Sequence, residues 1–421
     1  MNQDSISLRL IAIAIIGGAC FAASLLVLGL VMERQNRFSD AKREIASKWG
    51  ERQVITGPVI VAGIGGEVPT RAYVLPENVK IESTLAPETR SRGIFDVVVY
   101  TSHIKISGEF AADEIARAGA RSGTTVFSLP ITDTRGVEKQ FELTWAGAKH
   151  AFEPGPGAGF REGSGLHAAV PVNATSGRIP FSLEFQVRGS EGISFTPVGK
   201  ETVLLMSSPW PSPKFTGTFL PSQREVNASG FQAEWRLSSF GRSFPQTWRG
   251  DEVSTAQLMA STFGVDLYPG VDAYDMIFRS VKYAVLFIII TFVVFFLFDV
   301  LAKVRVHPIQ YLLIGSALAL FYILLLSLAE QIGFLLAYIL STAMIVILIT
   351  IYSAYVLKSR RRAIPIAALL VTLYGYLYFV LQLEDYALLF GALLLFFLLA
   401  AIMYLTRNVD WFNLAGDKTP A

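Results

Sequence analysis

Apolar positions gather in two parts of the chain and leave a long polar stretch between them. One run of 23 residues, 10–32, carries no charge. Five further runs follow, at 278–298, 309–328, 332–356, 364–382 and 386–405. Each is close to the roughly 20 residues that a helix needs to cross the hydrocarbon of a bilayer. The pattern predicts a membrane protein with six transmembrane helices, one N-terminal and five C-terminal, and a large domain inserted after the first.

The inserted stretch has the pattern of a β-rich domain. Its start, 33–49, has helical spacing and continues the first apolar run. Runs rich in β-branched and aromatic residues follow, bounded by Gly, Pro, Asn and Ser, for example 53–64, 93–110, 179–187 and 230–240. Such runs are typical of strands, and one short helix is expected at 111–120. We expect an all-β or β-rich domain, built as a sandwich or as two small β subdomains.

These patterns divide the chain into four parts. They are an N-terminal transmembrane anchor (1–32), the β-rich domain (33–276), a five-helix transmembrane bundle (277–406) and a short tail (407–421). The only cysteine, Cys20, lies within the first apolar run, so the inserted domain has no disulfide. A lipoprotein cleavage site is disfavoured because Gly17 replaces the large aliphatic residue expected three positions before Cys20. We therefore expect an uncleaved anchor.

Charged residues between the apolar runs predict the orientation. Lys and Arg mark the cytoplasmic ends of transmembrane helices, and in this chain they fall in alternate connections and in the tail: Lys303, Arg305, Lys358, Arg360, Arg361, Arg362 and Arg407. The other two connections contain Glu330, Glu384 and Asp385 and no basic residue. Both termini are therefore expected in the cytoplasm and 33–276 in the periplasm of a bacterial inner membrane. The basic residues of 34–43 oppose this orientation, but long domains translocate largely regardless of charge.

Composition and the absence of known motifs exclude several classes of function. Of all residues, 52% are apolar and 17% charged, and basic and acidic residues nearly balance within 33–276, which argues against nucleic acid as a partner. The histidines of the inserted domain, His103, His150 and His167, are scattered, and the sequence contains no HExxH, paired cysteines or Gly-x-Ser-x-Gly. We expect no metal, no cofactor and no enzymatic activity.

Polar residues at the ends of the apolar runs are the candidate functional positions. They are His307, Pro308, Gln310, Tyr311, Glu330, Gln331, Gln382, Glu384, Asp385 and Tyr386. We interpret them mainly as helix ends at the membrane surface: Pro308 fits a first helical turn, His307 a cap and Tyr311 the interface, and the acids lie where water is available. Tyr374, Tyr376 and Tyr378 lie deeper, where packing is favoured over a polar path.

Two alternatives assign these residues a chemical role. In a transporter or lipid-handling protein, the C-terminal bundle would bring Glu330, Gln310 and Tyr311 to a shared cavity. In a membrane enzyme acting on envelope precursors, Glu384, Asp385 and Glu330 would converge near the outer leaflet. Spacing along the chain does not decide whether either set meets.

Long blocks of the sequence resemble the CreD family of bacterial inner-membrane proteins, also called cell envelope integrity proteins. The resemblance covers 279–301, 306–338 and 374–411 in the helical part, and 92–100 and 208–248 in the inserted domain. One departure is Asp299, where the family more often has Glu. The resemblance implies an inner-membrane protein of the envelope stress response, under two-component control and linked to β-lactam and colicin responses, with no established enzymatic activity or ligand.

Together, these observations predict a non-enzymatic envelope protein. Its expected partners are the lipid bilayer and an envelope component or partner protein, which the periplasmic domain binds through a strand edge or a loop.

Overall fold

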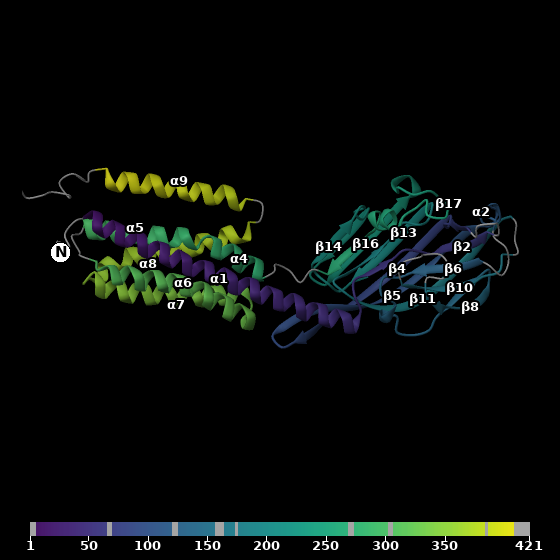
Figure 1. Cartoon of the computed structure of the whole chain (residues 1–421), viewed down its shortest axis with the longest axis horizontal. Coiled ribbons are helices and arrows are strands. Elements are labelled where there is room, and N and C mark those ends of the chain that lie inside the picture. Colours follow the sequence, from purple (N-terminus) through teal and green to yellow (C-terminus); the bar gives the residue numbers. More distant parts are fainter. Residues whose placement is uncertain are drawn as a thin grey trace, which may run out of the picture. The chain divides into compact units, whose positions relative to one another are not determined.

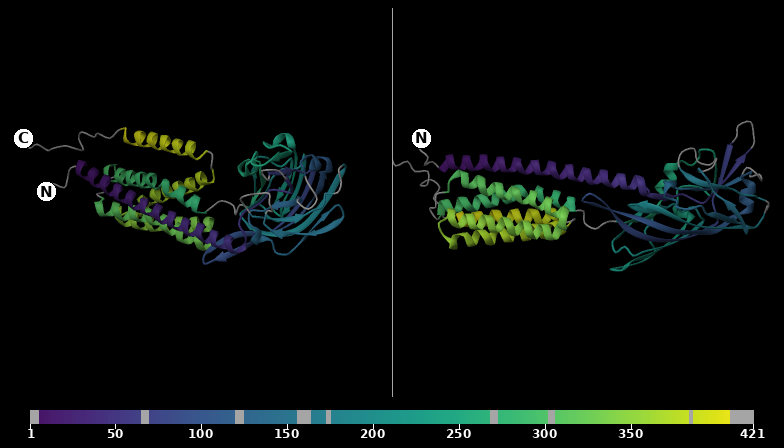
Figure 2. Two further views of the ribbon diagram at one scale, coloured as in Figure 1. Left: turned by 45° about the vertical axis from the view of Figure 1, so that its right-hand side comes forward. Right: turned by 90° about the horizontal axis from the view of Figure 1, so that it is seen from below.

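The computed structural model describes residues 6–64, 70–119, 125–155, 164–172, 176–267, 273–301, 306–383 and 386–407. The chain forms two compact units (Figures 1 and 2). The helical unit combines Met1–Phe38 with Val271–Ala421, and the β-rich unit is Ser39–Gly270.

The helices of the helical unit follow the predicted apolar runs. They are α1 (Ile6–Trp49), α4 (Ala273–Lys282), α5 (Ala284–Leu301), α6 (Pro308–Ile332), α7 (Phe334–Val356), α8 (Arg360–Gln382) and α9 (Ala387–Thr406). Among the described residues, α1, α6, α7 and α8 are each long and apolar enough to cross a membrane, and α9 contains a shorter apolar helix. α1 continues without a break to Trp49, which confirms the helical start expected at 33–49.

The run 278–298, predicted as one span, contains the end of one helix and most of another. These helices, α4 and α5, meet at Tyr283 with a bend of 41° and make a fifth span if they are counted together. α4 is amphipathic, because Asp275, Arg279 and Lys282 share one face while Tyr274 and Ile277 are buried on another. The uniformly apolar segment therefore begins at α5, six residues later than predicted.

Within the described residues, the strands of the β-rich unit form three sheets. In strand order, the eight-stranded sheet is β15 (Gln223–Asn227), β16 (Gly230–Ser238), β13 (Glu201–Ser208), β4 (Asn78–Arg92), β5 (Phe95–Ala111), β11 (Arg178–Ser190), β7 (Glu142–Trp145) and β8 (Ala148–Ala151). The six-stranded sheet is β17 (Thr247–Arg249), β3 (Thr70–Val74), β2 (Val59–Ile64), β6 (Thr125–Pro130), β10 (Gly165–Ala169) and β9 (Glu153–Pro154). The four-stranded sheet is β1 (Gln53–Ile55), β12 (Gly192–Phe195), β18 (Phe263–Leu267) and β14 (Pro213–Gly217).

Short helices complete this unit. The described residues include α2 (Ala112–Arg117) and α3 (Thr255–Ala260), with single 3-10 turns at Thr134–Gly136 and Ser239–Gly241. α2 confirms the helix expected at 111–120.

One face of the eight-stranded sheet forms the core of the β-rich unit. Phe110 on β5 lies 6.2 Å from Phe127 on β6, between ring centroids, and Trp235 on β16 lies 5.9 Å from Phe263 on β18. The large sheet therefore packs against both smaller sheets through a single hydrophobic core. This supports one β domain over two subdomains. Because side chains alternate along a strand, most polar residues of the large sheet point to its opposite, open face, whereas a few, such as Ser83 and Ser102, are buried and bond to each other.

Candidate functional site

The first turn of α6 contains four of the candidate residues. His307 is the N-cap: its Nδ1 accepts a hydrogen bond from the backbone N–H of Ile309 at 3.3 Å. Pro308 begins the helix, and the Gln310 Oε1 accepts from the His307 N–H at 2.9 Å, which completes a capping box. The predicted cap is confirmed, and Gln310 closes the helix end together with His307.

Tyr311, expected at the membrane interface, lies one turn inside α6. Its side chain is buried, and its ring packs 5.4 Å from Phe292 and 6.3 Å from Phe295. Aromatic residues of α5, which sequence patterning could not pair with α6, enclose it. The residue therefore belongs to the packing between these two helices.

Glu330, at the other end of α6, is more buried than predicted. Only 10% of its side chain is exposed. Its Oε1 accepts a hydrogen bond from the Tyr274 hydroxyl at 3.0 Å and lies 3.8 Å from the Arg34 Nε. Phe38 packs beside Tyr274, with ring centroids 6.0 Å apart. Glu330 therefore joins α6 to α1 and α4, at the points where these two helices approach the residues that lead into the β-rich unit.

The cavity expected of a transporter is not formed by its three predicted residues. α6 is one continuous helix from Pro308 to Ile332. At about 1.5 Å per residue, Gln310 and Glu330 lie roughly 30 Å apart along it. Gln310 and Tyr311 are at one end of the helix and Glu330 is at the other, so they do not converge.

The remaining candidates lie at separate helix ends. Gln331 and Gln382, near the ends of α6 and α8, are exposed, and Tyr386 is the N-cap of α9. Of the basic residues, Lys358 precedes α8, Arg360, Arg361 and Arg362 form its first turn, and Arg407 follows α9. Lys303, Arg305, Glu384 and Asp385 lie outside the described residues, so the convergence expected of a membrane enzyme stays a prediction.

The tyrosines of α8 are packed, as favoured from the sequence. Tyr374 is buried 4.5 Å from Phe321 and 4.9 Å from Phe287, between ring centroids. The Tyr376 hydroxyl donates to the Phe390 carbonyl at 2.5 Å, and Tyr378 lies 5.3 Å from Tyr338. These rings hold α8 against α5, α6, α7 and α9.

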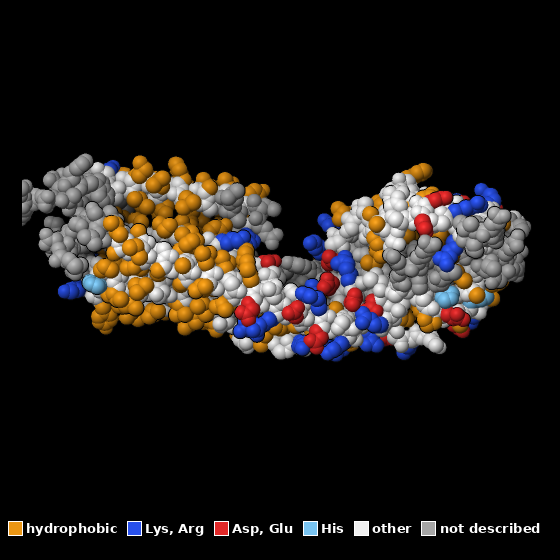
Figure 3. All heavy atoms as spheres, in the orientation of Figure 1, with side chains coloured by type: hydrophobic (Ala, Val, Ile, Leu, Met, Phe, Trp, Pro, Cys, Tyr) orange, Lys and Arg blue, Asp and Glu red, His pale blue; other side chains and the backbone are white. Residues whose placement is uncertain are grey.

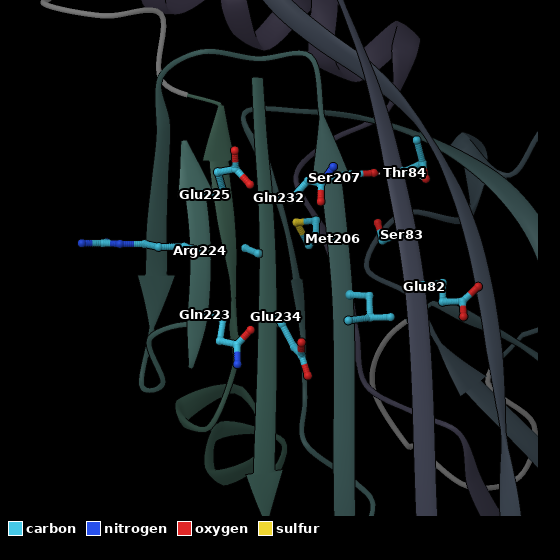
Figure 4. A pocket seen from close by; sticks show the side chains of 12 residues that line it. Glu82, Ser83, Thr84, Met206, Ser207, Gln223, Arg224, Glu225, Gln232 and Glu234 are labelled. Carbon is cyan, nitrogen blue, oxygen red and sulfur yellow. Dashed lines mark hydrogen bonds between the residues drawn. The ribbon is translucent and has the colours of Figure 1, made fainter. Parts of the chain in front are cut away.

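The open face of the eight-stranded sheet contains a polar groove that the sequence did not reveal. We call it the β15 groove; its volume is about 620 Å³. Figure 4 shows its side chains in rows that cross β15, β16, β13 and β4, and the two outer rows lie on the open face. Strand register forms the rows: Gln223, Glu234, Leu205 and Glu82 lie in one, and Glu225, Gln232, Ser207 and Thr84 in the other.

The groove continues along the strands. A second hollow of about 310 Å³ shares Thr84, Ser207, Glu225 and Gln232 with it and reaches the β15–β16 turn at Gly230. From Glu234 to Gly230 the floor is therefore roughly 13 Å long, at about 3.3 Å per residue. This length matches an extended segment of four or five residues.

Charge in the β15 groove is arranged in local pairs. The Lys80 ammonium donates a hydrogen bond to Glu82, at 2.5 Å, and holds the pKa of that carboxyl below its usual range. Glu234 accepts a hydrogen bond from the Arg236 guanidinium. Neutral hydrogen-bonding groups, including Gln223, Gln232 and Ser207, lie among these acids. The groove can therefore accept and donate hydrogen bonds along its whole length.

β15 is also an edge of the large sheet. It pairs with β16 on one side only, and all five of its residues are exposed. Edge strands offer backbone N–H and C=O groups to an incoming strand. Charged residues such as Arg224 and Glu225 are a common means of preventing uncontrolled pairing at such edges. An extended partner could pair with β15 and place side chains over the groove.

Two comparisons with known proteins cover nearly the whole chain. Residues 5–412 match the family model described as inner membrane protein CreD. The inner membrane protein CreD of Escherichia coli (strain K12) is 30% identical over 416 residues, which cover 94% of this chain and 92% of that protein. Among solved structures, an M1 zinc metallopeptidase from Deinococcus radiodurans aligns over 39% of this chain and 38% of its own. Its 6% identity and TM-score of 0.20 support no conclusion.

Proposed function

Because the chain belongs to the CreD family of inner membrane proteins, we propose that it is a six-span, non-enzymatic factor of the envelope stress response. In this proposal α9 is the sixth span, both termini are cytoplasmic, and the β-rich unit lies in the periplasm. There the unit binds an envelope component or a partner protein along the β15 groove.

One observation carries the binding proposal: a long polar groove lies directly beside an exposed edge strand. A partner in extended conformation would gain main-chain hydrogen bonds from β15 and side-chain contacts from the two rows. Figure 3 supports a membrane role for the helical unit and a binding role in water for the β-rich unit. Hydrophobic side chains cover much of the visible surface of the helical unit, and charged ones are scattered over the β-rich unit.

A non-enzymatic role is favoured by the surroundings of Glu330. Its described neighbours are a tyrosine and an arginine, Tyr274 and Arg34, which suits a joint between helices. A general acid or base would need a reacting group within hydrogen-bond reach, and Oε1 of this carboxylate is already engaged by these neighbours.

Photo-crosslinking in cells tests the groove. With a photoreactive benzoylphenylalanine at Gln232, on the groove floor, we expect a discrete crosslinked adduct of the full-length protein on gels. The same residue at Gln186 should give none. Gln186 is a matched control because it is exposed on the same face of the sheet and lies in the same cross-strand row as Gln232. It is four strands away, which places the two residues roughly 19 Å apart.

Blocking variants sharpen this test. Ser207→Tyr fills the groove, whereas Ser182→Tyr places the same ring on the same face of β11, outside the groove. We expect S207Y to reduce the Gln232 adduct at least fivefold and S182Y to leave it unchanged. Equal adducts with both variants would mean that binding in the groove does not occur.

The orientation can be tested through the single native cysteine. Cys20 is buried, with 3% of its surface exposed, so an introduced cysteine is labelled against a low background. Phe240 is 98% exposed in the β-rich unit, and Arg361 is exposed at the start of α8. In intact spheroplasts, a membrane-impermeant maleimide should label F240C at least tenfold more than R361C. The reverse ratio would invert the proposed topology.

A further inference from the structure

The helical unit contains an apolar groove between α1 and α5, which we call the α1–α5 groove. Its volume is about 370 Å³, and residues within 13–21 of α1 and 285–296 of α5 line it. Small residues of α1 create it: a Cβ added at Gly18 would meet nothing within 4 Å, and one at Gly17 would meet only the Phe292 ring, at 3.8 Å. None of the lining residues is charged.

A cation lies at one end of this groove. Lys282 ends α4, three residues before the first groove residue of α5, Val285. It is exposed, and its ammonium lies 4.5 Å from the centre of the ring of Phe278, four residues earlier on α4. Among the described residues, no carboxylate lies within salt-bridge distance of it.

The other basic residue of this part of α4, Arg279, is already engaged in hydrogen bonds, so Lys282 is the cation available to a ligand. The Arg279 guanidinium donates to the backbone carbonyls of Val380, at 3.4 Å, and Leu383, at 3.1 Å, at the end of α8. Asp275, Arg279 and Lys282 follow one face of α4, which is the arrangement of a helix lying at the membrane surface. The bend at Tyr283 then turns the chain into the apolar α5.

The dimensions suit one leaflet. From Val285 to Phe296 the groove follows α5 over twelve residues, a rise of roughly 17 Å. This length is about half of the ~30 Å hydrocarbon thickness. A lipid whose headgroup lies at Lys282 could therefore extend one acyl chain along the whole groove.

We infer that the α1–α5 groove binds an anionic phospholipid, with the phosphate on the Lys282 ammonium and an acyl chain against Gly18 and its neighbours. Lysine binds phosphate as a point charge. A zwitterionic lipid is a poorer occupant because its own ammonium group is repelled by Lys282. This site lies in the helical unit and does not depend on the function proposed for the β-rich unit.

Photolabelling of the full-length protein in nanodiscs tests this site. The discs contain phosphatidylcholine and a small fraction of phosphatidylglycerol with a diazirine on its acyl chain, and mass spectrometry maps the labelled peptides. We expect the α5 peptide to be labelled at least fivefold more than α7, whose lipid-facing residues Ile339, Ile347 and Ile351 supply the internal reference. Diazirine-phosphatidylcholine should give no such enrichment.

Two pairs of variants distinguish binding of the lipid headgroup from binding of its acyl chain. Lys282→Gln should abolish the enrichment and Lys282→Arg should keep it. Gly18→Leu fills the groove and should abolish it, whereas Gly29→Leu should not: a Cβ at Gly29 also meets nothing within 4 Å, but Gly29 does not line the groove.

The outcomes are distinguishable even if one variant fails to fold. Protection of Cys20 from a thiol reagent reports folding of the helical unit in each variant, and K282Q leaves the groove walls unchanged. Enrichment that persists in folded K282Q, or equal labelling by the two lipids in the native protein, would overturn the inference.

Discussion

Replacing Asp133 by alanine is expected to destabilise the β-rich unit by about 2–4 kcal/mol, because two backbone donors lose a charged acceptor. The Asp133 carboxylate is buried, with 5% of the residue exposed. It accepts the N–H groups of Glu51 and Arg135, both at 3.0 Å, and the Arg135 guanidinium at 2.8 and 2.9 Å. Arg135 in turn donates to the Ser47 carbonyl at 3.2 Å. The substitution therefore loosens the attachment of the end of α1 to the sheets.

The effect should depend on pH with a defined sign. Burial alone would raise the pKa of Asp133, but the hydrogen bonds from Arg135 and from the Glu51 backbone outweigh it, and the pKa lies below its usual range. An unfolded aspartate titrates near about 3.9, so the unfolded state binds the proton more readily. The stabilisation is complete above that value and disappears as the pH falls through the folded pKa. The difference in stability between the native protein and D133A should therefore be largest at pH 7 and should start to shrink as the pH falls below about 4.

Tryptophan fluorescence of the full-length protein in detergent can measure this change. Trp49, Trp145, Trp210, Trp235 and Trp248, five of the six tryptophans, lie in the β-rich unit. At 2–4 °C per kcal/mol, D133A should lower the melting temperature by roughly 5–15 °C.

Asp113→Ala is the matched control for D133A. Asp113 also pairs with an arginine, Arg117, at 2.5 Å, but its side chain is 53% exposed. Exposed pairs contribute little, so D113A should leave the transition nearly unchanged. Equal shifts for both variants would show that burial of Asp133 does not matter.

The apolar runs predicted the helices well because a long uncharged run has few alternatives to a membrane helix. The span predicted at 278–298 includes the end of α4, because Arg279 and Lys282 lie in a run whose average is still apolar. Only the three-dimensional face that they share with Asp275 identifies α4 as a separate amphipathic helix. Alternating strand patterns likewise predicted a β-rich domain but not its register.

The candidate sites depended on contacts that a single sequence does not encode. Glu330 was correctly placed at a helix end, but its burial comes from Tyr274, 56 positions away, and from Arg34 on α1. The β15 groove arises because four strands align Gln232, Ser207 and Thr84 in one row, and two of these strands, β13 and β4, are parallel and more than 100 positions apart. Each residue alone is an ordinary polar position on a strand.

Glu330→Ala should destabilise the helical unit by about 1.5–3 kcal/mol, since it removes a charged hydrogen-bond acceptor that is largely shielded from water. Glu330→Gln keeps an oxygen for the Tyr274 hydroxyl and removes only the charge that lies 3.8 Å from Arg34, a residue with 43% of its side chain exposed. We therefore expect E330Q to cost less than about 1 kcal/mol. This difference separates a structural joint from a titrating group, because a proton carrier would lose its function in both variants.

Accessibility of Cys20 provides the measurement, since the only cysteine is buried in the helical unit and reacts with a fluorogenic maleimide when that unit opens. E330A should lower the temperature of this opening transition by several degrees, while the melting temperature of the β-rich unit, monitored by tryptophan fluorescence, stays unchanged. Gln331→Ala, at the next and exposed position, is the control and should shift neither transition.

Combining E330A with Tyr274→Phe should cost less than the sum of the two single changes, because both remove the same hydrogen bond. Strict additivity, or an E330Q variant as unstable as E330A, would show that the Tyr274 bond does not hold α4 to α6.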